Sequence, residues 1–142
     1  MKIIKPSVII LIAIIYFESF SLQANVIKFL PDIELPAAGY LTIFNESEKD
    51  FEIYSVKSNN FKKVELHQSV KKNGRASMQK LEKLKIQANH EVKLEPGGIH
   101  LMLFEPKDKL EHDKKIPVYF LDKNNNEVFK ALLTLKNRNK EG

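Results

Sequence analysis

The chain consists of short runs of β-branched and aromatic residues separated by turn sequences, and this spacing restricts the folds that it can adopt. Turn signals fall at Asn73-Gly74, at Pro96-Gly97-Gly98 and at Asn124-Asn125-Asn126. Several short strands at such regular spacing favour an antiparallel β-sandwich or β-barrel. The one segment whose periodicity also allows a helix is 77–86, which is short and uncapped. The predicted strands are 40–44, 51–56, 64–67, 92–94, 99–104, 118–121 and 128–135.

The composition fits one globular domain and excludes several kinds of chemistry. The chain has 142 residues, of which 43% are hydrophobic, and a formal net charge of +5. It contains no cysteine, which excludes disulfide scaffolds, thiol catalysis, zinc fingers, iron–sulfur clusters, blue-copper sites and a lipid-modified N-terminal cysteine. Its lysine pairs are interspersed with acidic residues, so we expect no nucleic-acid binding. Hydrolase, metalloprotease and phosphate-loop motifs are missing from the sequence, so we do not expect an enzyme.

The first 24 residues have the pattern of a secretory signal peptide. Lys2 and Lys5 precede an apolar segment, 8–17, that is shorter than the about 20 residues of a spanning helix but suits a signal peptide. Small residues allow cleavage after Ala24, or alternatively after Ser21, and an uncleaved anchor is the competing interpretation. We therefore predict a periplasmic protein with no membrane anchor after cleavage. The predicted segments are a signal peptide at 1–24 and one domain at 25–142, whose tail, 137–142, is frayed.

The candidate metal ligands of the predicted mature chain are two histidines, His67 and His100, and two methionines, Met78 and Met102. His100 and Met102 share one face of a predicted strand, while Ile99, Leu101 and Leu103 alternate onto the core face. If Asn73-Gly74 forms a type I′ hairpin turn, Met78 becomes a diagonal neighbour of His67, with Cα atoms about 7–8 Å apart. We expect the four side chains at a solvent-accessible edge of the sheet, where they would meet around one ion.

Soft thioether sulfur combined with imidazole nitrogen, without thiolate or carboxylate, favours Cu(I). Zinc is the weaker candidate because thioethers are not among its usual ligands. Any one of these side chains alone is more often a core or surface residue, so the prediction depends on all four together. Glu65, two residues before His67, is expected to support that ligand rather than to act in catalysis. His90 and His112 are predicted to be surface residues, with a secondary Cu(II) role as the alternative.

The spacing His67-x10-Met78-x21-His100-x-Met102 resembles the copper-binding motif of the periplasmic PCuA(C) copper chaperones. The resemblance extends over residues 37–135. It implies a cupredoxin-like antiparallel Greek-key β-sandwich or barrel, with Cu(I) bound by His67, Met78, His100 and Met102. It also implies copper delivery to the CuA centre of cytochrome c oxidase, with oxidase subunit II or Sco-type copper proteins as partners. Segments that carry the resemblance besides the motif are 37–42, Asn45, 64–67, Asn73-Gly74 and 94–103.

Some positions depart from the pattern of that family. Gln68 replaces a common glutamate, Ile99 replaces a common aromatic residue, and the C-terminal tail has no histidine or methionine for a second copper site. We predict a monomeric Cu(I) metallochaperone. The alternatives are a metal-free protein-binding module of the cell envelope, a copper-tolerance or storage protein, and a copper-dependent redox enzyme.

Overall fold

A computed structural model describes residues 25–31 and 34–141. The predicted signal peptide, 1–24, lies outside these residues, and within them no helix is long and apolar enough to cross a membrane. The last element is a 3-10 turn, η1 (Arg138–Lys140), capped by the Asn137 side chain. The strands are β1 (Val26–Phe29), β2 (Ala37–Phe44), β3 (Phe51–Ile53), β4 (Ser55–Lys57), β5 (Phe61–Lys72), β6 (Arg75–Lys80), β7 (Leu84–Ile86), β8 (Glu91–Leu94), β9 (Ile99–Pro106), β10 (Lys115–Leu121) and β11 (Glu127–Asn137).

Most of these strands form one sheet that closes on itself. The hydrogen-bonded order is β1-β11-β10-β4-β5-β9-β2, and β1 pairs with β2 as well as with β11, so the path returns to its starting strand. β8 pairs with the second half of β2, and β3 and β7 form a separate small sheet. The predicted all-β class is therefore confirmed. The sheet is mixed rather than purely antiparallel, because β1 runs parallel to β11.

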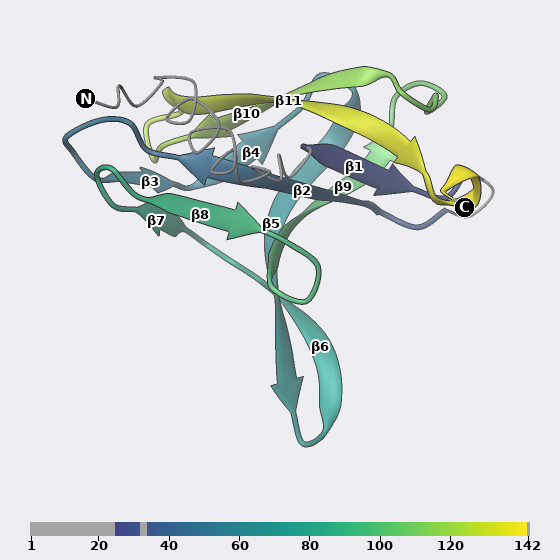
Figure 1. Cartoon of the computed structure of the whole chain (residues 1–142), viewed down its shortest axis with the longest axis horizontal. Coiled ribbons are helices and arrows are strands. Elements are labelled where there is room, and N and C mark those ends of the chain that lie inside the picture. Colours follow the sequence, from purple (N-terminus) through teal and green to yellow (C-terminus); the bar gives the residue numbers. More distant parts are fainter. Residues whose placement is uncertain (1–24, 32–33, 142) are drawn as a thin grey trace, which may run out of the picture.

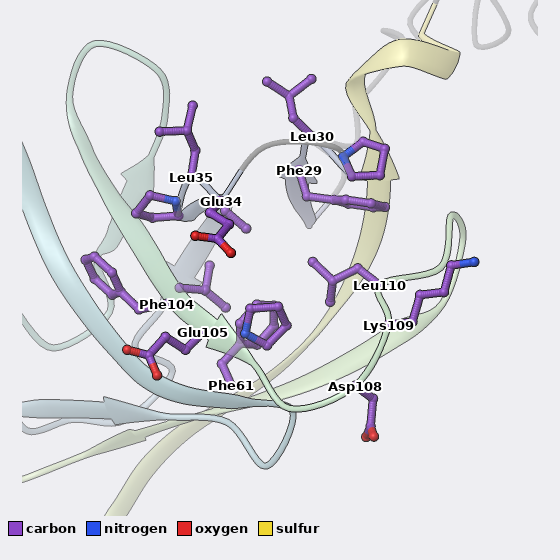
Figure 2. Close-up of a pocket in the computed structure, with 15 residues that line it drawn as sticks. Phe29, Leu30, Glu34, Leu35, Phe61, Phe104, Glu105, Asp108, Lys109 and Leu110 are labelled. Carbon is purple, nitrogen blue, oxygen red and sulfur yellow. The ribbon is translucent and has the colours of Figure 1, made fainter.

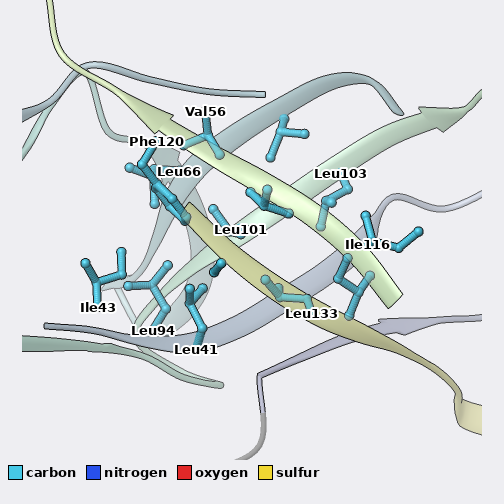
Figure 3. Close-up of a cluster of buried hydrophobic side chains, with 14 of the residues drawn as sticks. Leu41, Ile43, Val56, Leu66, Leu94, Leu101, Leu103, Ile116, Phe120 and Leu133 are labelled. Atoms are coloured by element: carbon cyan, nitrogen blue, oxygen red, sulfur yellow. The ribbon is translucent and has the colours of Figure 1, made fainter. Parts of the chain in front are cut away.

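The core lies inside the closed sheet and is filled by alternate residues of its strands. Leu101 and Leu103 of β9 are 0% and 1% exposed, and they lie beside their cross-strand partners Leu66 and Val64 of β5 on the core face of the sheet. Each fully buried aliphatic side chain of this kind stabilises the fold by about 1.5–3 kcal/mol. The labelled side chains of Figure 3 show the same packing for further strands, including Leu41, Ile116, Phe120 and Leu133.

The segment 77–86 is not a helix. Its first part belongs to β6, which pairs with β5, and its last part is β7, which pairs with β3. In β7, Leu84 and Ile86 are buried while Lys85 is exposed, which is the alternation of a strand. The pairing with β3 and the burial of these two side chains override the weak helical periodicity, because side chains two residues apart reach the core together in an extended backbone.

The β5–β6 hairpin extends beyond the closed sheet. Figure 1 shows it projecting away from the rest of the molecule. All six residues of β6 are exposed, and β6 pairs with no strand other than β5 among the described elements. We call residues 68–80 the arm. The body of the protein positions the base of the arm through β5, which is shared by the hairpin and the closed sheet.

Candidate metal centre

The hairpin turn has the predicted geometry. Asn73 and Gly74 both have positive φ, 53° and 75°, as a type I′ turn requires. The resulting register pairs Ser69 with Met78 and places Met78 diagonally from His67 on the same face of the hairpin. The prediction that these two residues are diagonal neighbours is confirmed.

A second pairing, between β5 and β9, brings the other two predicted ligands to the same face. His67 lies directly opposite His100, and Glu65 lies opposite Met102. The two imidazole ring centres are 6.3 Å apart. The residues between them along each strand, Leu66 and Leu101, point the other way, into the core. Three predicted ligands, His67, His100 and Met102, therefore share one small patch on the face opposite the core.

The hydrogen bonds of the two imidazoles define which nitrogen of each is free. His67 places its Nε2 2.8 Å from an oxygen of the Glu65 carboxylate, and His100 places its Nδ1 3.1 Å from the carbonyl oxygen of Gly98. Both oxygens are acceptors, so these nitrogens carry the hydrogens and donate. The remaining nitrogens, His67 Nδ1 and His100 Nε2, are buried and have no hydrogen-bond partner. Each presents an unshared lone pair, which is costly in a buried site unless a metal ion or a proton uses it.

The distance between the rings allows both lone pairs to reach one ion. Imidazole nitrogens bind metal ions such as zinc at about 2.0–2.1 Å, with the ring centre a further ~1.1 Å behind, so rings sharing an ion have centres up to about 6.5 Å apart. The separation of His67 and His100, 6.3 Å, falls within that limit. Among the described residues there is no cluster of three or more His, Cys, Asp or Glu side chains suited to a metal ion. Of the other predicted ligands, Met102 lies on the same face as the two histidines, and Met78 lies diagonally from His67 on the arm.

Glu65 is held ionised next to His67. The hydrogen bond from His67, followed by the ammonium groups of Lys63 and Lys80 at 3.6 and 3.7 Å, keeps the pKa of Glu65 below its usual value. A carboxylate that accepts the Nε2 hydrogen fixes the tautomer of the ring and makes its other nitrogen a better donor. The contact expected from the sequence between Glu65 and His67 is thus present in the structure.

The four side chains differ in their exposure to solvent. His100 is only 3% exposed, Met102 is half-buried, and Met78 on the arm is 60% exposed. The expected open edge is therefore wrong for His100, which lies between neighbouring strands of the sheet. Tyr40 of β2 flanks His100 at 6.5 Å, and Phe104 flanks His67 at 6.3 Å between ring centres. Phe104 follows Met102 by two residues along β9 and therefore lies on the same face. Its place beside the predicted ligands could have been predicted from the sequence by this alternation.

A cavity of about 970 Å³ lies farther along the sheet and does not contain the predicted ligands. Figure 2 shows Phe61, Phe104 and Leu110 lining it, with the carboxylates of Glu34 and Glu105 nearby. A single ion coordinated by four side chains needs no cavity of this size. The unpartnered imidazole nitrogens therefore locate the candidate metal centre better than this cavity does.

The two remaining histidines make local hydrogen bonds away from this centre. His90 is exposed, and its Nδ1 lies 2.7 Å from the carbonyl oxygen of Ala88. His112 is half-buried rather than fully on the surface, because its Nδ1 accepts the backbone N–H of Asn137. Both have a structural partner, in contrast to the free nitrogens of His67 and His100.

Comparison with known proteins places the chain in a family. A model of the family described as "Putative lipoprotein LpqE-like" matches residues 22–131, which is most of the chain. The chain belongs to the LpqE-like family. Since bacterial lipoproteins are envelope proteins, this description fits an envelope location. The sequence has no cysteine to carry a lipid, however. An uncharacterized protein of Rickettsia prowazekii (strain Madrid E), RP573, is 28% identical over 94 residues, or 65% of this chain. The chain spans about half of that relative, 52% of its length.

Solved structures of PCuAC domains have the same fold. The copper-bound PCuAC domain of PmoF2 superimposes with a TM-score of 0.61 at 16% identity, covering 81% of this chain and 90% of that domain. The Cu(I) form of DR1885 from Deinococcus radiodurans gives a TM-score of 0.61 at 19% identity, covering 80% and 75% of the two chains. These matches confirm the predicted cupredoxin-like class and the resemblance to PCuA(C) proteins.

Proposed function

We propose that this LpqE-like protein is a periplasmic carrier of Cu(I), bound by His67, Met78, His100 and Met102. The observation that carries the proposal is the pair of buried imidazole nitrogens without partners on adjoining strands. Copper-bound proteins of the same fold support the identity of the ion. Residues 1–24 would serve as the signal peptide that is removed on export.

The donor set suits a soft ion that must later be released. Thioethers and imidazoles are the kinds of ligand that Cu(I) accepts, and all four donors are neutral. His67 would bind through Nδ1 and His100 through Nε2, because the other nitrogen of each ring is hydrogen-bonded. Glu65 would offset the positive charge of the ion from behind His67. Neutral ligands hold the ion less tightly than thiolates, which favours a carrier over a permanent cofactor site.

Delivery would begin at the most exposed ligand. Met78, at 60% exposure on the arm, can be displaced by a ligand of the acceptor while His67 and His100 still hold the ion. Successive exchange of ligands would then transfer the copper without leaving it free. We propose the CuA centre of cytochrome c oxidase subunit II as the recipient, directly or through Sco-type proteins. The protein would act as a monomeric carrier and not as an enzyme.

Anaerobic Cu(I) titration of the purified protein, combined with X-ray absorption at copper, tests this proposal. We expect one equivalent to bind with a mixed sulfur and nitrogen shell. His100→Ala should lose most of the affinity in a competition with a Cu(I) chelator. His90→Ala is the matched control, because His90 is exposed and bonded within its own loop, and it should bind like the parent.

Several outcomes would contradict the proposal. Equal losses in the two histidine variants would mean that the affinity is not located at this site. A shell without sulfur would remove both methionines from it. If the parent retains no Cu(I) against the chelator, a metal-free protein-binding module becomes the better interpretation. Tight binding without transfer to a CuA domain would instead indicate copper storage or tolerance.

A further inference from the structure

The arm is strongly basic along the stretch of chain that carries Met78. Residues 66–81 contain Lys71, Lys72, Arg75 and Lys80 and no acidic residue. The first three lie at the tip of the hairpin, where Lys72 is paired with Arg75 across the strands. All of them are exposed. Two like charges directly opposite one another repel and destabilise a hairpin. The tip would therefore be stabilised by negative charges placed next to it.

These charges find no compensation within the protein. In the described part of the chain, Lys71, Lys72 and Arg75 make no ion pair, and Lys80 reaches only Glu65, at 3.7 Å. Glu65 is already hydrogen-bonded to His67. Some lysines elsewhere do have partners: the exposed Lys85 pairs with Asp50 and the half-buried Lys136 with Asp113.

The register places two of the basic side chains, Lys71 and Lys80, on the same face of the hairpin as the most exposed predicted ligand, while Lys72 and Arg75 lie on its other face. Met78 is opposite Ser69, so its diagonal neighbours across the hairpin are His67 and Lys71. Lys80, two residues along β6, shares the same face as Met78. A copper ion at Met78 would thus add a positive charge between two ammonium groups. Carboxylates from outside the protein are the natural counter-charge for such a surface.

We propose that the arm docks onto an acidic surface of the protein that exchanges copper with this chain. This inference rests on the proposed function and names the chemistry of the partner. Docking at the tip would bring the partner's own ligands next to Met78, which is the ligand that they can replace first. The partner's carboxylates would also neutralise the lysines as the ion passes between the two proteins.

A protein partner fits the arm better than an anionic lipid surface does. Basic residues alone would suit either, but the arm also presents a thioether on the same face as Lys71 and Lys80. In addition, β6 is an edge strand whose outer backbone groups are unpaired within the described structure. Such an edge can accept hydrogen bonds from a partner's extended segment, whereas lipid headgroups give no comparable match.

The test measures the rate of Cu(I) transfer from the loaded full-length protein to synthetic peptides. Two peptides share one Cu(I)-binding segment with Met and His residues and differ only in flanks of Asp or of Ser. At low salt we expect transfer to the acidic peptide to be about tenfold faster or more. The advantage should disappear near 1 M salt, where the screening length is about 3 Å. The arm variant Lys71→Gln/Lys72→Gln/Arg75→Gln should lose the advantage without binding Cu(I) more weakly than the parent.

The control variant is Lys49→Gln/Lys57→Gln/Lys123→Gln, which removes the same charge from exposed body positions without ion pairs in the described structure. It should keep the preference for the acidic peptide. Equal losses in the arm and control variants would overturn the proposal, because net charge alone would explain the rates. A parent without preference would also overturn it. Binding to phosphatidylglycerol vesicles is measured for the parent and the arm variant. If the arm variant no longer binds the vesicles but transfers copper to the acidic peptide as fast as the parent, the arm binds lipid and the proposal is also overturned. If the parent protein itself does not bind Cu(I), the result counts against the proposed function instead.

Discussion

Removing the carboxylate of Glu65 should weaken Cu(I) binding by an amount that the structure allows us to estimate. Its oxygen accepts a hydrogen bond of 2.8 Å from His67 Nε2, and the two side chains are only 16% and 14% exposed. Hydrogen bonds to charged groups contribute about 1.5–3 kcal/mol. Partners of metal-binding histidines typically change metal affinity by about 10–100-fold, or about 1.4–2.8 kcal/mol at 1.4 kcal/mol per tenfold. The two estimates agree, and the low exposure leaves little screening by solvent.

Two substitutions separate charge from hydrogen bonding. Glu65→Gln keeps an amide oxygen as acceptor and loses only the charge, so we expect a few-fold loss of Cu(I) affinity. Glu65→Ala loses both, and we expect a loss of about 10–100-fold. Nitrogen NMR of the apo protein provides a second readout. In the parent, His67 should carry its hydrogen on Nε2, and in Glu65→Ala a fraction with the hydrogen on Nδ1 should appear.

The measurement is chelator competition under anaerobic conditions, with Glu105→Gln as the matched control. Glu105 is 69% exposed and pairs with Lys62 at 3.1 Å, and it makes no hydrogen bond to either histidine. It should leave Cu(I) affinity unchanged. If Glu65→Ala binds Cu(I) as tightly as the parent and its His67 keeps one tautomer, Glu65 does not position His67. The role of Glu65 in fixing the tautomer of His67 and strengthening its Nδ1 as a donor would then be refuted.

Three other perturbations follow from the geometry. Gly39→Ala would place a Cβ 2.9 Å from Leu101 Cβ, so chemical denaturation should show a loss of about 1–3 kcal/mol; an unchanged midpoint would mean that β2 and β9 can separate easily. Met102→Leu should lower Cu(I) affinity more than Met78→Leu, because Met78 is 60% exposed and water competes for its place; the reverse order would contradict the arrangement. The pKa of Asp50 is lowered by a backbone hydrogen bond and a nearby lysine, so the unfolded chain binds its proton more readily. The stability that it contributes is present above pH 3.8, its usual pKa, and should be lost as pH falls through the lower folded value. Asp50→Asn should flatten that part of the thermal-melting profile, and an unaltered acid limb would reject the assignment.

Local signals in the sequence were sufficient for the hairpin and for most strands. Asn73-Gly74 determines a turn with two positive φ angles, and that turn alone sets the register between His67 and Met78. The parallel partner of β11 could not be predicted in this way. β1 follows the signal-like segment at the start of the chain and pairs with the last strand, a contact that depends on closure of the whole sheet.

The sequence was enough to predict which residues form the candidate site, but not how deeply they are buried or which groups they contact. Alternation along β9 was enough to place His100 and Met102 on one face. The pairing of His67 with His100 joins strands that are far apart in sequence, and no local pattern reports it. The burial of His100 depends in turn on the strands at either side. Its Nε2 is left free because Nδ1 donates its hydrogen to the carbonyl oxygen of Gly98 in the glycine turn. These features arise only when the sheet closes.

The contrast between the ligands has a physical consequence for a copper carrier. His67 and His100 lie on β5 and β9, which are paired with each other and anchored to the core by Leu66 and Leu101, so their free nitrogens are positioned before any ion arrives. Met78 lies on an exposed strand with a single neighbour. Donors that are positioned in advance reduce the ordering cost of binding. An exposed outer donor is open to replacement by an incoming ligand. A sheet that continues into an exposed hairpin can therefore hold a soft ion at its base and release it along the arm.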